Sequence, residues 1–198
     1  MTQPVVATMS ISLDGIGAGR NQTEERPFGD MPDVLHRWMF ETPDENRAEI
    51  DAIVSAGAYI MGRNMFGPIR GEWDRDWRGW WGQNPPYHAP VFVLTHHPRE
   101  SIEMEGGTTF HFVTDGIEAA LDRARDAAGD RTVHVAGGVS TINQYLAAGL
   151  LDELMLQISP VLIGDGLRLF EDVGGYELDL VSTRGASLAT HVRYRVRR

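Results

Sequence analysis

The segment Val133-His134-Val135-Ala136-Gly137-Gly138-Val139-Ser140-Thr141-Ile142 changes character at its centre. Residues 133–136 suit a buried strand, two glycines follow, and a helical pattern begins after them. A strand, a glycine turn and a helix start together present backbone N–H groups and a positive dipole end to an anion. Glycines also let a phosphate approach the main chain closely. We expect a dinucleotide pyrophosphate on Gly137, Gly138, Val139, Ser140 and Thr141, although a plain strand-to-helix connection has the same pattern.

Composition narrows the class of protein. The chain has 198 residues, of which 42% are hydrophobic and 23% charged, so residues 1–198 are expected to form one globular domain. A net charge of −10 argues against a nucleic-acid partner. The absence of cysteine excludes disulfides and thiolate chemistry, and the scattered histidines lack zinc-enzyme spacing, so no metal is expected.

The sequence shows no signal peptide at its start and no segment long and apolar enough to span a membrane. No apolar run approaches the ~20 residues of a membrane span. The start, Met1-Thr2-Gln3-Pro4, lacks the basic region of a signal peptide. We therefore expect a cytoplasmic protein with no membrane partner.

Apolar runs alternate with helical patterns along most of the chain, which predicts an α/β domain with a mostly parallel sheet. Strands are expected over 5–13, 58–61, 91–94, 109–113 and 133–136, with a closing antiparallel hairpin of 177–183 and 187–196. Helices are expected from Asp30 to Met39, with Asp33 in the first turn, and over 44–55, 117–128 and 141–148. The run 153–163 contains Pro160, which predicts an edge position or a bend.

The segment 67–90 holds four of the five tryptophans, Trp73, Trp77, Trp80 and Trp81, together with several prolines and glycines. A loop of this length in a compact domain usually has a function. We interpret it as a lid packed on its own aromatic side chains or as a dimer contact, with direct stacking on a substrate as the alternative.

Four short stretches each follow directly after an expected strand: Asp14-Gly15, Gly62-Arg63, Thr95-His96 and Gly137-Gly138. Parallel strands end at a common edge of the sheet, and ligands of α/β proteins bind at that carboxyl edge. The four stretches are therefore expected to meet in one binding site.

With these stretches in place, the sequence resembles the dihydrofolate reductase-like superfamily, and within it the C-terminal reductase domain of the riboflavin-biosynthesis protein RibD. The resemblance covers most of the chain from Val5 to Phe170. The matching pieces, in the family's order, are residues 9–15, Met61-Gly62-Arg63, residues 91–95, Val135-Ala136-Gly137-Gly138, and residues 150–154 through 160–166. The resemblance implies a three-layer dihydrofolate reductase-like fold, a homodimer, and NADPH as cofactor.

The resemblance also assigns residues to the cofactor. Gly62 would open a helix from which Arg63 reaches the adenosine 2′-phosphate and stacks on adenine, and Thr95 and His96 would complete that pocket. The Gly137–Gly138 peptide, typically cis in this family, would lie against the pyrophosphate. Ala7 would offer main-chain groups to the nicotinamide, and Asp14 would fix the neighbouring turn. Each of four residues also has a simpler interpretation. Arg63 could be a surface arginine and His96 an exposed loop histidine. Ala7 could be a small core residue, and Asp14 could belong to an ordinary Asp-Gly turn.

The substrate side departs from both known branches. RibD reductases carry a substrate-contacting glutamate where this chain has about Val135, and the segment after the second strand is closer to the folate enzymes. Asp33 lies near the place of the folate enzymes' acid and is the candidate proton donor, or else a helix cap. Trp38 would form the floor under a flat heterocycle, or else pack in the core.

The implied reaction is hydride transfer from NADPH to a C=N or C=O group of a small heterocycle, similar to a pterin or a ribosylaminopyrimidine. Two alternatives remain open. One is a protein that keeps the fold and the nucleotide site without catalysis. The other is a flavin- or nucleotide-binding module that uses the same glycine turn.

Overall fold

The computed structural model describes residues 3–197. Met1, Thr2 and Arg198 lie outside the described residues. The strands are β1 Val5–Ser12, β2 Ile16–Ala18, β3 Ala58–Gly62, β4 Pro90–Leu94, β5 Ile102–Glu103, β6 Thr109–Val113, β7 Val133–Gly137, β8 Glu153–Ser159, β9 Leu167–Arg168, β10 Leu178–Gly185 and β11 Thr190–Val196. The α-helices are α1 Arg37–Phe40, α2 Arg47–Val54, α3 Arg63–Phe66, α4 Gly116–Ala128 and α5 Val139–Ala147.

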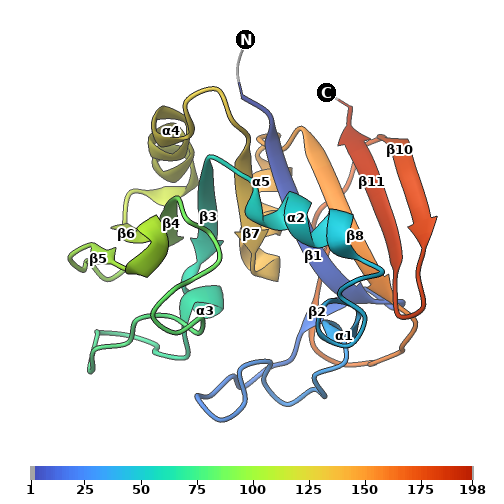
Figure 1. The fold of residues 1–198 in the computed structure, drawn as a ribbon, viewed down its shortest axis with the longest axis horizontal. Helices are drawn as coiled ribbons and strands as arrows, with labels where there is room; N and C mark the ends of the chain where they lie inside the picture. The colour runs from blue at the N-terminus through green and yellow to red at the C-terminus, as the bar shows by residue number, and fades with distance from the viewer. Residues whose placement is uncertain (1–2, 198) are drawn as a thin grey trace.

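One nine-stranded sheet organises the molecule, in the order β10-β11-β8-β1-β7-β3-β4-β6-β5 (Figure 1). The strands from β8 to β6 in that order run parallel to one another. The outer strands β5 and β10–β11 are antiparallel to their neighbours, and β2 pairs with β9 separately. The expected parallel sheet and closing hairpin are thus confirmed.

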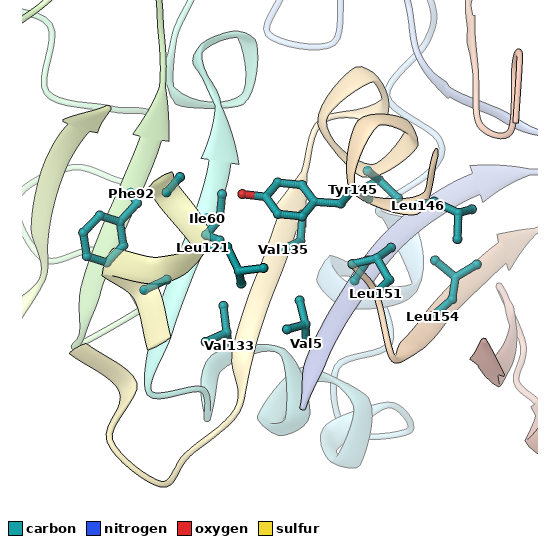
Figure 2. Close-up of a cluster of buried hydrophobic side chains, with 14 of the residues drawn as sticks. Val5, Ile60, Phe92, Leu121, Val133, Val135, Tyr145, Leu146, Leu151 and Leu154 are labelled. Carbon is teal, nitrogen blue, oxygen red and sulfur yellow. The ribbon is translucent and has the colours of Figure 1, made fainter. Parts of the chain in front are cut away.

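A hydrophobic layer lies between the sheet and helices α4 and α5, behind the sheet in Figure 1. Alternate residues of the central strands point into it, because successive side chains of a strand face opposite sides. Figure 2 shows Leu121 of α4 and Tyr145 of α5 directed at Val133 and Val135 of β7. The Tyr145 hydroxyl donates to the carbonyl of Ile117 over 2.6 Å, which joins the two helices.

The opposite face of β1 and β8 carries several polar residues, and the segment that carries α1 and α2 covers it, whereas the same face of β3, β4 and β6 packs a second hydrophobic cluster that includes Tyr59, Val91 and Phe110. Ser10 of β1 and Gln157 of β8 are buried beneath the covering segment. The Trp38 Nε1–H donates to Ser10 Oγ over 3.0 Å, and the ring of His191 packs edge-on against Trp38 at 5.1 Å. Two layers of helices therefore enclose the sheet, which confirms the three-layer arrangement.

The helix expected from Asp30 is wrong for most of its length, because regular helix begins only at Arg37. The Asp30 carboxylate accepts hydrogen bonds from the Arg20 N–H and the Asn21 side-chain amide, so it closes a loop instead of capping a helix. Asp33 consequently lies outside any helix, and its expected place in a first turn is corrected.

Two other expectations need correction. The helix expected over 44–55 begins at Arg47, and its apolar residues Ile50, Ile53 and Val54 are only half-buried. The run that contains Pro160 forms the inner strand β8, which ends at Ser159, so the proline terminates the strand and does not mark an edge. Within residues 3–197, none of the helices has the length and hydrophobicity needed to cross a bilayer.

Candidate cofactor and substrate site

The ends of β3 and β7 bring the predicted nucleotide-binding residues side by side. Met61 of β3 pairs with Gly137 of β7. A Cβ added to Gly62 would overlap the Thr141 hydroxyl and lie 3.7 Å from the Gly138 nitrogen. The helix start that carries Arg63 therefore packs directly against the glycine turn, at the carboxyl edge of the sheet.

The glycine turn leaves open space in front of α5. Gly137 adopts a φ of +123°, which favours glycine, and its peptide bond to Gly138 is cis. Gly138 is the N-cap of α5, and no side chain caps that helix. A Cβ on Gly138 would meet nothing within 4 Å. Val139 and Thr141 point into the protein while Ser140 is exposed, so the main chain of the first turn is the surface offered to an anion.

Arg63 carries a charge that the described residues satisfy only in part. Its Nη1 donates to the Thr95 hydroxyl over 3.3 Å, whereas Nε and Nη2 are buried and have no hydrogen-bond partner among residues 3–197. Burial, reinforced by the positive charge of Arg70, lowers the pKa of Arg63. A buried, unpaired cation is costly, and an anion with two acceptor oxygens would relieve that cost.

The remaining predicted cofactor residues differ in exposure. Thr95 is buried beside Arg63, while His96 is exposed. Ala7 is fully buried in β1, between Val135 of β7 and Leu154 of β8. Ala7 lies within β1, and Thr95 and His96 follow the end of β4.

Asp14 fastens the end of β1 to the loop after β8. Its carboxylate accepts hydrogen bonds from the Ser12 hydroxyl at 2.6 Å and from the N–H groups of Ile163 and Gly164 at 3.1 and 2.7 Å. These bonds lower the pKa of Asp14 to about 2, with the Ser12 bond as the largest cause. Asp14 therefore remains ionised at neutral pH and holds a rigid turn beside the site.

Asp33 and Trp38 occupy different surroundings. Asp33 is exposed at the rim of a hollow of about 420 Å³ formed by residues 25–33, with His36 Nδ1 at 3.8 Å from its carboxylate. Trp38 is fully buried, and its N–H is satisfied by Ser10. The indole thus has the contacts of a core residue, and no face of it is open to a flat ligand.

Several side chains near the glycine turn were missed by sequence reasoning. A Cβ on Gly137 would lie 3.2 Å from the Met65 sulfur and 3.7 Å from the Met9 sulfur. Met65 lies in α3, the helix that follows β3, and Met9 lies within β1, so only Met65 could have been suggested by nearness to a strand end. The guanidinium of Arg63 also lies 3.9 Å from the ring centre of Trp73, a contact across the tryptophan-rich segment that no local pattern reveals.

The arrangement of this edge, with parallel strands, a cis Gly-Gly turn at the start of a helix and a half-paired arginine beside it, defines a dihydrofolate reductase-like fold. Solved structures agree. The putative riboflavin biosynthesis protein from Shewanella sp. PV-4 matches 100% of both chains with a TM-score of 0.64 at 20% identity. Dihydrofolate reductase from Enterococcus faecalis, solved with NADP(H), matches 100% of both chains with a TM-score of 0.62 at 13% identity.

Sequence comparison gives the family. Residues 3–191 match the model of the RibD C-terminal domain. The Bacillus subtilis (strain 168) protein YyaP is 24% identical over 191 residues, which cover 91% of this chain and 87% of YyaP. The chain belongs to the RibD C-terminal domain family, and the resemblance inferred from its sequence motifs is confirmed.

Proposed function

We propose that the protein is an NADPH-dependent reductase that transfers hydride to a C=N or C=O group of a small pterin- or ribosylaminopyrimidine-like heterocycle. Membership of the RibD C-terminal domain family supports an oxidoreductase. The observation that carries the proposal is the juxtaposition of Arg63, with two buried unpaired N–H groups, and the uncapped glycine turn on the adjacent strand.

The residues present fit such a cofactor. Arg63 and Thr95 would hold the 2′-phosphate, because they directly follow the adjoining strands β3 and β4 and two of the Arg63 nitrogens lack a partner among residues 3–197. The main chain of residues 137–141 would hold the pyrophosphate, and Met9 and Met65 would line the space next to it. When bound, the reduced nicotinamide supplies the hydride; the protein supplies position and a fixed field.

On the substrate side, Asp33 is proposed to give the proton that a reduced C=N nitrogen needs, directly or through a water. Its exposed carboxylate at the rim of the hollow of residues 25–33 leaves it accessible. Trp38 is proposed to act as a positioning residue, because it anchors the covering segment to Ser10 of β1. Replacing Asp33 by Asn should lower turnover about 10²–10⁴-fold and change its pH profile; unchanged turnover and profile would remove Asp33 from this role.

Nucleotide binding is the first test. NADPH should raise the melting temperature clearly more than NADH does, because only NADPH carries the phosphate for Arg63. Dihydropterins and ribosylaminopyrimidines are then screened for NADPH oxidation at 340 nm. Equal stabilisation by both nucleotides, or by neither, would refute the assignment of Arg63.

A binding protein without catalysis is the second candidate, and the buried Trp38 favours it, since the indole leaves no open face for a flat substrate. Retained NADPH binding with no turnover on any heterocycle would support this candidate. A yellow purified protein, or a preference for ligands without a 2′-phosphate, would instead indicate the flavin- or nucleotide-binding alternative.

A further inference from the structure

The indole of Trp73 lies on Arg63 in the place where a nucleotide base would stack. We propose that Trp73 is an internal cap on the Arg63 pocket, which must leave before the pocket admits a phosphorylated nucleotide. The inference rests on the proposed function, because the pocket is the one assigned there to the adenosine 2′-phosphate.

Trp73 is firmly seated in this position. The Arg63 guanidinium carbon lies 3.9 Å from its ring centre, which is van der Waals contact and leaves no room for a second ring between them. The Trp73 Nε1–H donates to the carbonyl of His97 over 3.0 Å. Its ring is nearly perpendicular to those of Phe66 and Phe112, with ring centres 6.0 and 5.1 Å apart. The ring is therefore a specific occupant and not a loose surface side chain.

The hydrogen-bond donors of Arg63 are inaccessible, as is the flat face of its guanidinium group. Nη1 is engaged with Thr95, and Nε and Nη2 are out of contact with solvent. A phosphate arriving from solution therefore cannot reach these two nitrogens in the arrangement described. Displacement of the segment is the step that exposes them.

The segment that supplies the ring also supplies negative charge. Glu72 and Asp74, on either side of Trp73, are the charges that favour the protonated form of Arg63, against Arg70 and Arg99. The Trp73 ring thus stands in for a base, while Glu72, which itself bonds to His97 over 2.8 Å, and Asp74 add negative charge near Arg63. Binding would exchange this internal ring and its charges for those of the nucleotide, so the net gain from stacking would be small.

Exposed polar contacts hold much of the segment in place. Arg70 donates to the Gln22 side-chain carbonyl over 2.8 Å, Arg75 lies 3.6 Å from Glu24, and Arg99 donates to Asp76 over 2.8 Å. Gln22 and Glu24 belong to the loop after β2, so two loops meet at the lower edge of the sheet in Figure 1. Such exposed contacts stabilise weakly, so the main resistance to opening comes from the aromatic packing of Trp73 and Trp77 and from their indole hydrogen bonds.

Removal of the cap should tighten binding. We expect Trp73→Leu to bind adenosine 2′,5′-bisphosphate about 5–30-fold more tightly than the unchanged protein, because no ring has to be displaced. Leucine keeps an apolar group against Phe66 and Phe112, and thermal unfolding verifies that the variant is folded. Trp80→Leu is the matched control, because Trp80 belongs to the same segment but packs on Trp77; its affinity should stay unchanged.

Fluorescence gives a second readout that does not depend on activity. With excitation at 295 nm, adenosine 2′,5′-bisphosphate should change the tryptophan emission of the unchanged protein and of Trp80→Leu, and the change should be lost in Trp73→Leu. Weaker or equal binding by Trp73→Leu overturns the cap.

These experiments distinguish a failure of the cofactor assignment to Arg63 from a failure of the proposed Trp73 cap. If the unchanged protein prefers adenosine 2′,5′-bisphosphate to adenosine 5′-monophosphate and Trp73→Leu binds no more tightly, the cofactor assignment stands and the cap is wrong. If neither protein distinguishes the two nucleotides, both proposals are wrong.

Discussion

The two halves of the carboxyl edge differ in how their residues reach it. On the β3–β7 side, Arg63 and the Gly137–Gly138 pair directly follow or end adjacent strands, and strand pairing alone brings them together. On the β1 side, Asp33 lies in the long connection after β2 and Trp38 in the short helix α1 that ends it, and tertiary contacts decide where they point. The difference teaches that a strand end fixes a neighbouring residue in space, whereas a long loop does not.

The largest expected effect tests whether Trp38 belongs to the core. Trp38→Ala should lower the free energy of unfolding by about 3–5 kcal/mol, because it leaves a large cavity and an unsatisfied Ser10 hydroxyl. Urea denaturation measures this. Phe40→Ala is the control in the same helix, since Phe40 is 71% exposed and its loss should change stability by no more than about 0.5 kcal/mol. Equal stability of the two variants would contradict a core role.

The second prediction addresses the β3–β7 side. Arg63→Met should weaken NADPH binding about 30–100-fold and NADH binding much less, because charge-assisted hydrogen bonds to the 2′-phosphate are lost. Calorimetric titration with each nucleotide measures the two losses of affinity separately. Arg47→Met, on exposed helix α2, is the matched control. An equal loss of affinity for both nucleotides would show that Arg63 supports the fold and not the phosphate.

The third prediction separates two glycines of one cluster. Gly138→Ala should leave stability nearly unchanged but weaken NADPH binding about 10-fold, because its Cβ meets only the open space before α5. Gly62→Ala should instead destabilise the protein by about 1–3 kcal/mol, since its Cβ overlaps the Thr141 hydroxyl. Thermal unfolding with and without NADPH distinguishes them. If Gly138→Ala binds normally, the pyrophosphate does not lie there.

The smallest effect concerns Asp14. Its folded-state pKa of about 2 lies below the ordinary 3.8, so the unfolded chain takes up the proton first as the pH falls. The stability that Asp14 contributes is present above about pH 4 and is lost as the pH falls toward 2. Denaturation across this range should show the gap between the unchanged protein and Asp14→Asn closing. A constant gap would mean that the carboxylate does not fix the turn.

Prediction from sequence was accurate for the strands and for the residues that directly follow them. Apolar runs located the parallel strands, and the glycine stretches after β3 and β7 lie together at the carboxyl edge, as expected. The helix expected at Asp30 failed, because the carboxylate satisfies loop N–H groups that only tertiary structure brings near. The contact between Trp73 and Arg63 could not be foreseen either, since it joins a strand end to a segment without regular structure. The functional roles of all these residues stay predictions.

The closing hairpin has a consequence for how the chain is made. Arg184 and His191 both bond to the side-chain carbonyl of Asn46, whose amide holds the carbonyl of Trp38. Strands β10 and β11 thus complete the support of a segment that precedes them by 138 to 145 residues in the sequence. Before β10 and β11 are synthesised, β3, β4 and β7 are available for pairing, but Asn46 lacks the contacts with Arg184 and His191 that support the covering over Ser10.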